Sequence, residues 1–302
     1  MKLEFKNVTK QYGEVNAVNK VNCVMEKGIY GLLGVNGAGK TTFLRLVTGL
    51  AFPTSGTLSL WGKTVEKELQ EQRKRIGCMI ETPALFPTMT AYQNMEIQRI
   101  QRGIPDKAVI QKTLDMVGLK DTGKKAVRNF SLGMRQRLGI AIALLNTPEF
   151  LILDEPINGL DPQGIAEVRD TIQRLRDERN MTILISSHIL EELSKIATDY
   201  GIIHNGSLLQ ELTSEELMKR CSERIEIELI HPEQAVPILD RMGFTNYQVT
   251  DKSHIHIFER LNESANVNME LAKAGILVNG ISITSEELET YFLNLTGGNQ
   301  NA

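Results

Sequence analysis

A glycine-rich segment near the N-terminus carries the residues most suited to chemistry. Gly34, Gly39, Lys40 and Thr41 occupy the fixed positions of the pattern GxxxxGK[ST], directly after an apolar run. Glycines allow the backbone to wrap around phosphate groups and to point its N–H groups inward. The lysine of this pattern reaches the β- and γ-phosphates, and the hydroxyl that follows it coordinates Mg²⁺. The segment therefore predicts a site for ATP and Mg²⁺, formed by Gly34, Asn36, Gly37, Ala38, Gly39, Lys40 and Thr41.

Two carboxylates follow a second apolar run, Phe150–Leu153. Asp154 and Glu155 would leave the carboxyl end of a buried strand, at the edge of the sheet where the phosphate loop also lies. Asp154 suits the coordination of Mg²⁺ together with Thr41. Glu155 suits the positioning and polarising of an attacking water, so we expect it to be the general base. An acidic pair that only caps a helix is the alternative.

Two further positions suit an anion. His188 ends the next apolar run, where it could contact a γ-phosphate, so we expect it to be catalytic; a purely structural histidine is the alternative. Ser131 and Gly133 precede a helix that runs through Ile140–Leu145. The N-terminus of that helix is a second place where backbone N–H groups could hold phosphate.

Taken together, these motifs resemble those of the ATP-binding cassette (ABC) family, and within it the nucleotide-binding subunit of a transporter. The resemblance covers residues 1–210, where six motifs occur in the family's order and spacing. It implies that Tyr12 stacks on adenine and that Thr42 completes the Walker A loop. It also implies that Asp161 belongs to the D-loop and that His188 is the switch histidine.

The resemblance also implies partners. In this family two subunits pair head to tail, and each completes the other's site with its signature segment, here Ser131–Met134. A second ATP-binding subunit, expected to be an identical chain, and a separate integral membrane permease are therefore implied. A soluble ABC-type ATPase that drives no transport is the alternative. The DNA-repair members of that class insert a long coiled coil before the signature, and the segment between Lys40 and Ser131 holds no heptads.

Two departures from the family pattern narrow the resemblance. The signature reads Phe-Ser-Leu-Gly-Met instead of Leu-Ser-Gly-Gly-Gln, and it keeps Ser131 and Gly133. Glu81 stands where the family usually has Gln, at a position that senses Mg²⁺ and the attacking water, so we expect it to serve in catalysis and metal binding. With these features the chain resembles the subgroup that exports bacitracin- or lantibiotic-type peptides. The resemblance thus implies an ATPase that powers export of an antimicrobial peptide or drug.

The elements that must position these residues follow from periodicity. Strands alternating with helices through residues 1–210 predict an α/β P-loop domain with its active site at the carboxyl ends of the strands. Residues 88–145 are mostly helical in pattern. The resemblance implies that residues 86–148 form a helical subdomain that docks on the membrane subunit. Asn205-Gly206 stands between apolar pairs and predicts a hairpin.

Charge divides the chain near residue 210. The net charge is −3 over 302 residues, but residues 211–302 carry 15 acidic and 7 basic residues. We therefore expect an ABC ATP-binding domain over 1–210 and a C-terminal accessory domain over 211–302. An acidic second domain also argues against nucleic acid as a partner, because phosphate contacts need clustered Lys and Arg.

Hydropathy and cysteine usage bear on location. Apolar runs such as Ile140–Leu145 are far shorter than the roughly 18 residues of a spanning helix. The first residues lack the apolar region of a signal peptide. The three cysteines are widely spaced and are typical of free thiols in a reducing compartment. We expect a cytoplasmic protein held on the cytoplasmic face of the cell membrane by its permease.

Residues 211–302 have a separate pattern. After a helix near Ser214–Arg220, strands and helices alternate in β-α-β-β-α-β order, which is typical of a small α+β domain of ferredoxin-like fold. The ranges are strands Arg224–Ile230, Asn246–Thr250, His254–Phe258 and Ile276–Ile283, with helices Pro232–Met242, Glu263–Ala274 and, at the end, Glu286–Leu295. Period-two spacing places Ile225, Ile227, Leu229, Ile255 and Ile257 inward. His231, His254 and His256 are expected at the surface; zinc bound by His254 and His256 is the alternative.

Overall fold

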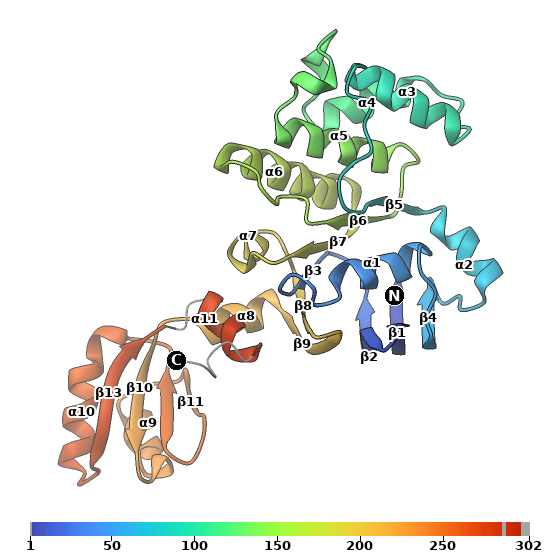
Figure 1. Ribbon diagram of the computed structural model, residues 1–302. Helices are drawn as coiled ribbons and strands as arrows, with labels where there is room; N and C mark the ends of the chain where they lie inside the picture. The colour runs from blue at the N-terminus through green and yellow to red at the C-terminus, as the bar shows by residue number, and fades with distance from the viewer. Residues whose placement is uncertain (1, 286–287, 297–302) are drawn as a thin grey trace. The chain divides into compact units, whose positions relative to one another are not determined.

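The computed structural model describes residues 2–285 and 288–296 (Figure 1). Contacts divide the chain into two compact units, Met1–Ser214 and Glu215–Ala302. The division lies a few residues beyond the boundary expected at 210. The last strand of the first unit explains the difference, since β9 (Ser207–Thr213) runs through that point. Leu212 within it is buried.

A six-stranded sheet forms the centre of the first unit. Its strand order is β5-β6-β7-β3-β8-β9, parallel except for β9, which pairs antiparallel with β8. The central strands are buried along their whole length, as their continuous apolar sequences predict. The bounds are β3 (Ile29–Leu33), β5 (Ile76–Met79), β6 (Phe150–Asp154), β7 (Thr182–Ser187) and β8 (Asp199–His204).

A second sheet lies against the first helix. It is three-stranded and antiparallel in the order β2-β1-β4, with β1 (Leu3–Tyr12), β2 (Val15–Met25) and β4 (Ser55–Leu60). Helix α1 (Lys40–Thr48) packs between the two sheets. On the side of the three-stranded sheet, its Phe43 stacks on Phe5 with 4.5 Å between the ring centroids. One apolar cluster joins Phe5 and Phe43 to Leu32 and Phe150 of the central sheet. This packing fixes the helix that follows the phosphate loop.

The remaining helices of the first unit include the expected helical layer. Within residues 86–148 lie α3, α4 and α5, which occupy one end of the unit in Figure 1. Thr90 begins α3 with a capping box, and Gly49 ends α1 at φ 78°, as glycine after a helix allows. The bounds are α2 (Glu66–Arg73), α3 (Ala91–Gln101), α4 (Ala108–Met116), α5 (Leu132–Leu144), α6 (Pro162–Arg179) and α7 (Leu190–Ser194), with 3-10 turns η1 (Lys120–Thr122) and η2 (Val127–Asn129).

The second unit has a four-stranded antiparallel sheet in the order β11-β12-β10-β13. Its strands are β10 (Arg224–Leu229), β11 (Tyr247–Val249), β12 (His254–Ile257) and β13 (Val278–Thr284). Its helices are α8 (Ser214–Cys221), α9 (Val236–Arg241), α10 (Ser264–Lys273) and α11 (Leu288–Leu295), with 3-10 turns η3 (Pro232–Gln234) and η4 (Leu261–Glu263).

One helix of the second unit differs in extent from the sequence prediction. The helix expected over Pro232–Met242 is divided into η3 and the short α9, and each piece has a proline in its first turn. Proline donates no backbone hydrogen bond, so Pro237 begins a helix more easily than it continues one. The last helix was expected from Glu286, which lies outside the described residues.

The two faces of this sheet differ in polarity. Ile225, Ile227 and Leu229 of β10 are fully buried with Ile255 and Ile257 of β12. They pack with Ile238 and Leu239 of α9 and with Val267 and Leu271 of α10. The predicted inward face is confirmed, and the alternating residues, among them Glu226 and His256, lie on the opposite face.

Candidate nucleotide site

The phosphate-loop lysine lies at the beginning of α1. Lys40 is 5% exposed, and its Nζ donates hydrogen bonds to the carbonyls of Gly34 at 2.5 Å and Val35 at 3.2 Å. The same Nζ lies 3.1 Å from Glu155 Oε1. The loop therefore bends back over its own lysine, which brings a positive charge to the start of α1, where the helix dipole is also positive.

Glycine is required at both ends of the loop. Gly39 caps α1 at φ 110°, and a Cβ there would stand 2.3 Å from the carbonyl oxygen of Ala17. A Cβ on Gly34 would stand 2.6 Å from the carbonyl oxygen of Ile203. By contrast, a Cβ on Gly37 would meet no heavy atom within 4 Å, but its φ of 83° favours glycine. The middle of the loop is therefore open, as a backbone that approaches phosphates must be.

Asp154 is the centre of a small group of hydroxyls. Its carboxylate is 4% exposed and accepts a hydrogen bond from Thr41 Oγ1 at 3.0 Å. Its other oxygen accepts one from Ser186 Oγ at 2.5 Å. The Thr41 hydroxyl and the Asp154 carboxylate are oxygen ligands of the kind that Mg²⁺ prefers. No cluster of three or more His, Cys, Asp or Glu suited to a metal occurs among the described residues. Two protein ligands beside phosphate oxygens are a common arrangement for Mg²⁺.

Glu155 follows Asp154 in a left-handed backbone conformation. Its φ is 47°, and its N–H donates to Ser186 Oγ at 2.9 Å. Its Oε2 lies 2.8 Å from His188 Nδ1. Its Oε1 is buried and, apart from the ion pair with Lys40, has no hydrogen-bond partner. The carboxylate therefore lies between Lys40 and His188, and its Oε1 can still accept a hydrogen bond.

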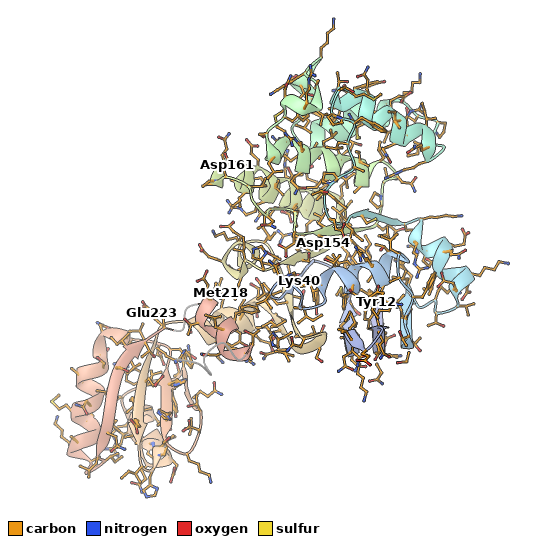
Figure 2. All side chains as sticks on the ribbon, in the orientation of Figure 1. Tyr12, Lys40, Asp154, Asp161, Met218 and Glu223 are labelled. Carbon is orange, nitrogen blue, oxygen red and sulfur yellow. The ribbon has the colours of Figure 1, made fainter. Side chains whose placement is uncertain are left out.

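Residues from three elements thus meet at one edge of the central sheet. Lys40 and Thr41 follow β3, Asp154 and Glu155 end β6, and His188 follows β7. These strands are neighbours in the sheet, so their carboxyl ends adjoin. Figure 2 shows Lys40 and Asp154 in the middle of the first unit.

The second predicted anion group lies elsewhere in the unit. Ser131 caps α5 by accepting from the N–H of Met134 at 3.2 Å, and Asp161 caps α6 by accepting from the N–H of Gly164 at 3.1 Å. The two helix N-termini adjoin, since a Cβ on Gly133 would stand 3.3 Å from Gly164 Cα. Figure 2 shows Asp161 well away from Lys40. Within one chain, Ser131, Gly133 and Asp161 are therefore not brought to the phosphate loop.

Glu81 and Tyr12 lie at the margin of the site. Glu81 has φ 61° and forms an ion pair with Arg45, one turn after Thr41 on α1. Among the described residues it has no recorded hydrogen bond or ion pair with Thr41, Asp154 or Glu155. Tyr12 ends β1 with its side chain 47% exposed and the ammonium of Lys10 4.8 Å from its ring centroid. One face of the ring is thus available for stacking.

Sequence reasoning missed two residues that hold the carboxylates. Ser186 contacts both Asp154 and Glu155, and Arg45 holds Glu81. A small hydroxyl at the end of an apolar strand, next to the acidic strand, is the signal that indicates Ser186. The four-residue spacing between Thr41 and Arg45 indicates a shared helix face.

The residues present fit ATP with Mg²⁺. The open Gly37 backbone, the buried Lys40 and the available Glu155 oxygen leave donors and an acceptor where a triphosphate and a water would be held. Thr41 and Asp154 would hold the metal. When bound, Mg²⁺ supplies positive charge that neutralises phosphate oxygens.

Comparison with known proteins identifies the family. Residues 18–158 match the family model described as ABC transporter. A bacitracin transport ATP-binding protein of Enterococcus faecalis is 43% identical over 98% of this chain and 96% of its own. A lantibiotic transport ATP-binding protein of Streptococcus pyogenes is 44% identical over 69% of this chain and 90% of its own.

Solved structures agree with these relatives. An ATP-binding subunit of an ABC transporter is 26% identical with a TM-score of 0.62, covering 72% of this chain and 92% of its own. No helix in the described part of the chain is long and apolar enough to cross a membrane. The Enterococcus relative matches along nearly the whole length of both chains, so the chain belongs to the ABC transporter family, as one of its ATP-binding proteins.

Proposed function

We propose that this chain hydrolyses ATP to power a membrane permease that exports an antimicrobial peptide of the bacitracin or lantibiotic type. The observation that carries the proposal is that Glu155 contacts both Lys40 and His188. Beside them, Thr41 donates a hydrogen bond to Asp154. These are the groups that ATP hydrolysis requires, and the relatives named above supply the substrate class. A drug of similar chemistry is included in that class.

Each residue of the site has a role in this proposal. Lys40 and the loop N–H groups from Gly34 to Thr42 bind the phosphates, while Thr41 and Asp154 hold Mg²⁺. Glu155 Oε1 accepts the proton of the attacking water, and His188 orients the carboxylate through Oε2. Tyr12 stacks on the base. Glu81 exchanges its Arg45 partner for the metal shell or the attacking water.

Two partners complete the proposal. Ser131, Gly133 and Asp161 lie together but away from Lys40, so a second copy of the chain would bring them to the phosphates in a head-to-tail dimer. A permease would dock on a groove of about 370 Å³ beside the helical subdomain, 86–148, lined by Thr82, Leu85, Pro87, Val127 and Leu132 among others. The chain would then be a cytoplasmic protein, peripheral on the cytoplasmic face of the cell membrane.

The second unit is proposed to be an accessory domain of ferredoxin-like fold. The strand order β11-β12-β10-β13, with α9 and α10 on one face, supports that assignment. Its residues, 215–302, contribute none of the groups proposed for hydrolysis. This supports an ABC ATP-binding domain that is complete without them.

Substitution of the two central residues tests the proposal. Lys40→Ala should lose ATP affinity, because it removes a charged contact to the phosphates. Glu155→Gln should bind ATP normally but lower the rate of hydrolysis by about 100-fold or more, because an amide cannot accept the proton. Both are measured on purified protein, by nucleotide binding and by phosphate release.

An exposed glutamate provides the matched control. Glu233→Gln makes the same chemical change on the surface of the second unit and should leave both measurements unchanged. Hydrolysis at the parental rate by Glu155→Gln would refute the assignment of the general base. For the substrate, cells that carry the chain with its permease should resist bacitracin or a lantibiotic, and the Glu155→Gln variant should abolish that resistance.

A further inference from the structure

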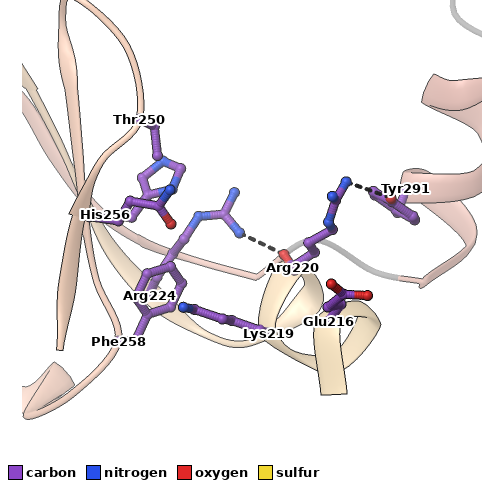
Figure 3. A pocket seen from close by; sticks show the side chains of 9 residues that line it. Glu216, Lys219, Arg220, Arg224, Thr250, His256, Phe258 and Tyr291 are labelled. Atoms are coloured by element: carbon purple, nitrogen blue, oxygen red, sulfur yellow. Dashed lines mark hydrogen bonds between the residues drawn. The ribbon is translucent and has the colours of Figure 1, made fainter. Parts of the chain in front are cut away.

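A pocket of about 430 Å³ opens on the face of the second unit's sheet opposite to α9 and α10. It is formed by α8, the start of β10, the strands β11 and β12, and α11 (Figure 3). Arg224 and His256 alternate with the inward-facing Ile225 and Ile257, which places them on this open face. The volume is in the range of small-molecule sites. Every residue of the lining belongs to the second unit.

The pocket collects positive charge in an otherwise acidic domain. Residues 211–302 contain seven basic and fifteen acidic residues, yet three of the seven, Lys219, Arg220 and Arg224, line this one pocket. Glu216 is the only carboxylate among the lining residues that the structure describes. Burial lowers the pKa of His256, and the charge of Arg224 lowers it further, so both favour the neutral imidazole. The described residues of the lining therefore carry more positive than negative charge, in contrast to the domain as a whole.

Arg224 is held in place but keeps a donor. Its side chain is 14% exposed, and one terminal nitrogen donates to the carbonyl of Arg220 at 3.1 Å. The other lies 3.7 Å from Glu226, too far for a hydrogen bond, and the buried Nε of Arg224 has no hydrogen-bond partner among the described residues. A buried donor of this kind gains from an acceptor.

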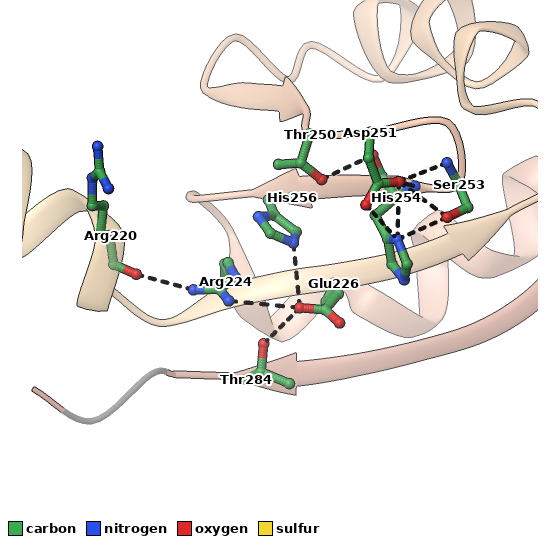
Figure 4. A network of polar contacts seen from close by, with 9 residues as sticks. All are labelled: Arg220, Arg224, Glu226, Thr250, Asp251, Ser253, His254, His256 and Thr284. Atoms are coloured by element: carbon green, nitrogen blue, oxygen red, sulfur yellow. Dashed lines mark hydrogen bonds and ion pairs between the residues drawn. The ribbon is translucent and has the colours of Figure 1, made fainter. Parts of the chain in front are cut away.

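Glu226 lies on the same open face and fixes the groups around it. Figure 4 shows its carboxylate between Arg224, His256 and Thr284, with His256 Nε2 at 3.3 Å and Thr284 Oγ1 at 3.4 Å. The register places Glu226 directly opposite His256 on the neighbouring strand. Glu226 is thus shared among three groups and does not form a hydrogen bond with Arg224.

Aromatic rings supply an apolar side to the pocket. The ammonium of Lys219 lies 6.0 Å from the ring centroid of Phe258, and the guanidinium of Arg220 lies 5.8 Å from that of Tyr291. Tyr291 also accepts a hydrogen bond from Arg220 at 2.9 Å. The cations are thus positioned beside ring faces. A ligand that contacts them would also contact the rings.

We propose that this pocket binds a small organic oxyanion, a phosphate or carboxylate joined to an apolar group. The oxyanion contacts Arg224 and Lys219, and the apolar group lies against Phe258. The site is separate from the nucleotide site and gives the accessory domain a ligand of its own. Because α8 follows β9 without a loop, the ligand contacts the segment that joins the two units.

Titration of the full chain with phenyl phosphate tests the proposal. The imidazole resonances of His256, assigned through a His256→Gln variant, report on the pocket, and those of His188 report on the nucleotide site. Phenyl phosphate should shift the His256 resonances saturably and raise its pKa, because a nearby anion favours the imidazolium. Inorganic phosphate should bind more weakly. Benzylamine, with the same ring and the opposite charge, should cause no shift.

Variants locate the binding. Arg224→Gln and Lys219→Gln should each weaken phenyl phosphate binding by about tenfold or more, as loss of a charged hydrogen bond does. Lys219 is exposed, so its variant keeps the test valid where Arg224→Gln fails to fold. Lys252→Gln, an exposed lysine outside the pocket, is the matched control and should bind normally.

Three results would overturn the proposal. One is the absence of a saturable His256 shift in the folded protein, and another is an equal shift with benzylamine. The third is normal phenyl phosphate binding in both pocket variants. A His256 shift with an acidic peptide or anionic phospholipid vesicles, but none with phenyl phosphate, would likewise reject a small-molecule site in favour of a macromolecular partner.

Discussion

Ser186 connects the two carboxylates of the nucleotide site. It is fully buried, it donates to Asp154 and it accepts from the backbone of Glu155. One hydroxyl therefore sets the orientation of the proposed metal ligand and helps to hold the strained backbone of the proposed base. Residues that orient a ligand in this way affect activity without touching the substrate.

Ser186→Ala should lower ATP turnover by about 10–100-fold, the usual effect of removing a group that orients a metal ligand. It should also lower the free energy of unfolding by about 1–3 kcal/mol, because two buried polar groups lose a partner. Phosphate release at varied Mg²⁺ and urea unfolding would measure these effects. Ser187→Ala is the control, since Ser187 is equally buried and, among the described residues, its hydroxyl bonds only to the backbone N–H and carbonyl of Ile189. Equal losses in both variants would contradict the role of Ser186.

The residue scale also shows where sequence prediction stops. Lys40, Thr41, Asp154 and Glu155 could be found because their types and order are distinctive. Ser186 was missed, because a hydroxyl at the end of an apolar strand becomes informative only once the neighbouring strand is known to carry the carboxylates. The pocket of the second unit was missed for another reason: its cations come from α8 and β10, but its rings come from β12 and α11. Such convergence depends on strand register and packing, which no local pattern encodes.

At the scale of elements, the turn between β11 and β12 is organised by one aspartate. Asp251 accepts from the backbone N–H groups of Ser253 at 2.7 Å and His254 at 2.9 Å, and its second oxygen lies 3.0 Å from His254 Nδ1 (Figure 4). These contacts lower the pKa of Asp251 to about 2, and the hydrogen bond from the backbone of Ser253 contributes most. The hydrogen bond that His254 donates to Asp251 raises the pKa of His254 above its usual value.

The sign of each shift defines a pH window. Asp251 contributes stability above its unfolded pKa of about 3.9, and the contribution is lost as the pH falls through about 2. His254 contributes fully below about 6.5, and its contribution is lost as the pH rises through the higher folded pKa. Both contributions are therefore present between about pH 4 and 6.5.

Asp251→Asn should return the pKa of His254 toward about 6.5, since the amide accepts hydrogen bonds but carries no charge. The pKa is followed by NMR titration of the His254 imidazole. Glu233→Gln serves as the control, because its carboxylate contacts His231 instead. An unchanged His254 pKa in Asp251→Asn would show that the pair does not interact in solution.

At the scale of the whole molecule, the chain is two units joined at α8. The alternation of strands and helices predicted the first unit's class because each buried strand has a continuous apolar sequence. Charge composition indicated a boundary, but composition changes gradually and the packing of Leu212 in β9 decides where the first unit ends. Proline positions explain the division of the expected helix at 232–242.

Deletion of residues 215–302 should leave a folded first unit that binds ATP with parental affinity, because no residue of the nucleotide site lies beyond His188. A cut after residue 210 is the informative comparison, since it removes part of β9, including the buried Leu212, and should lower the unfolding temperature. Circular dichroism and equilibrium nucleotide binding measure both outcomes. A folded 1–214 fragment that failed to bind ATP would require a contribution of the second unit to the site.

The left-handed backbone at Glu155 lowers the stability of the fold but positions the carboxylate that is proposed to act in hydrolysis. A side chain other than glycine, asparagine or aspartate in this conformation costs on the order of 1 kcal/mol, and the hydrogen bond from its N–H to Ser186 holds it there. Glycine at this position would relieve the strain and remove the proposed base. Directed evolution for heat resistance alone would therefore favour inactive chains, and selection at this position must include turnover.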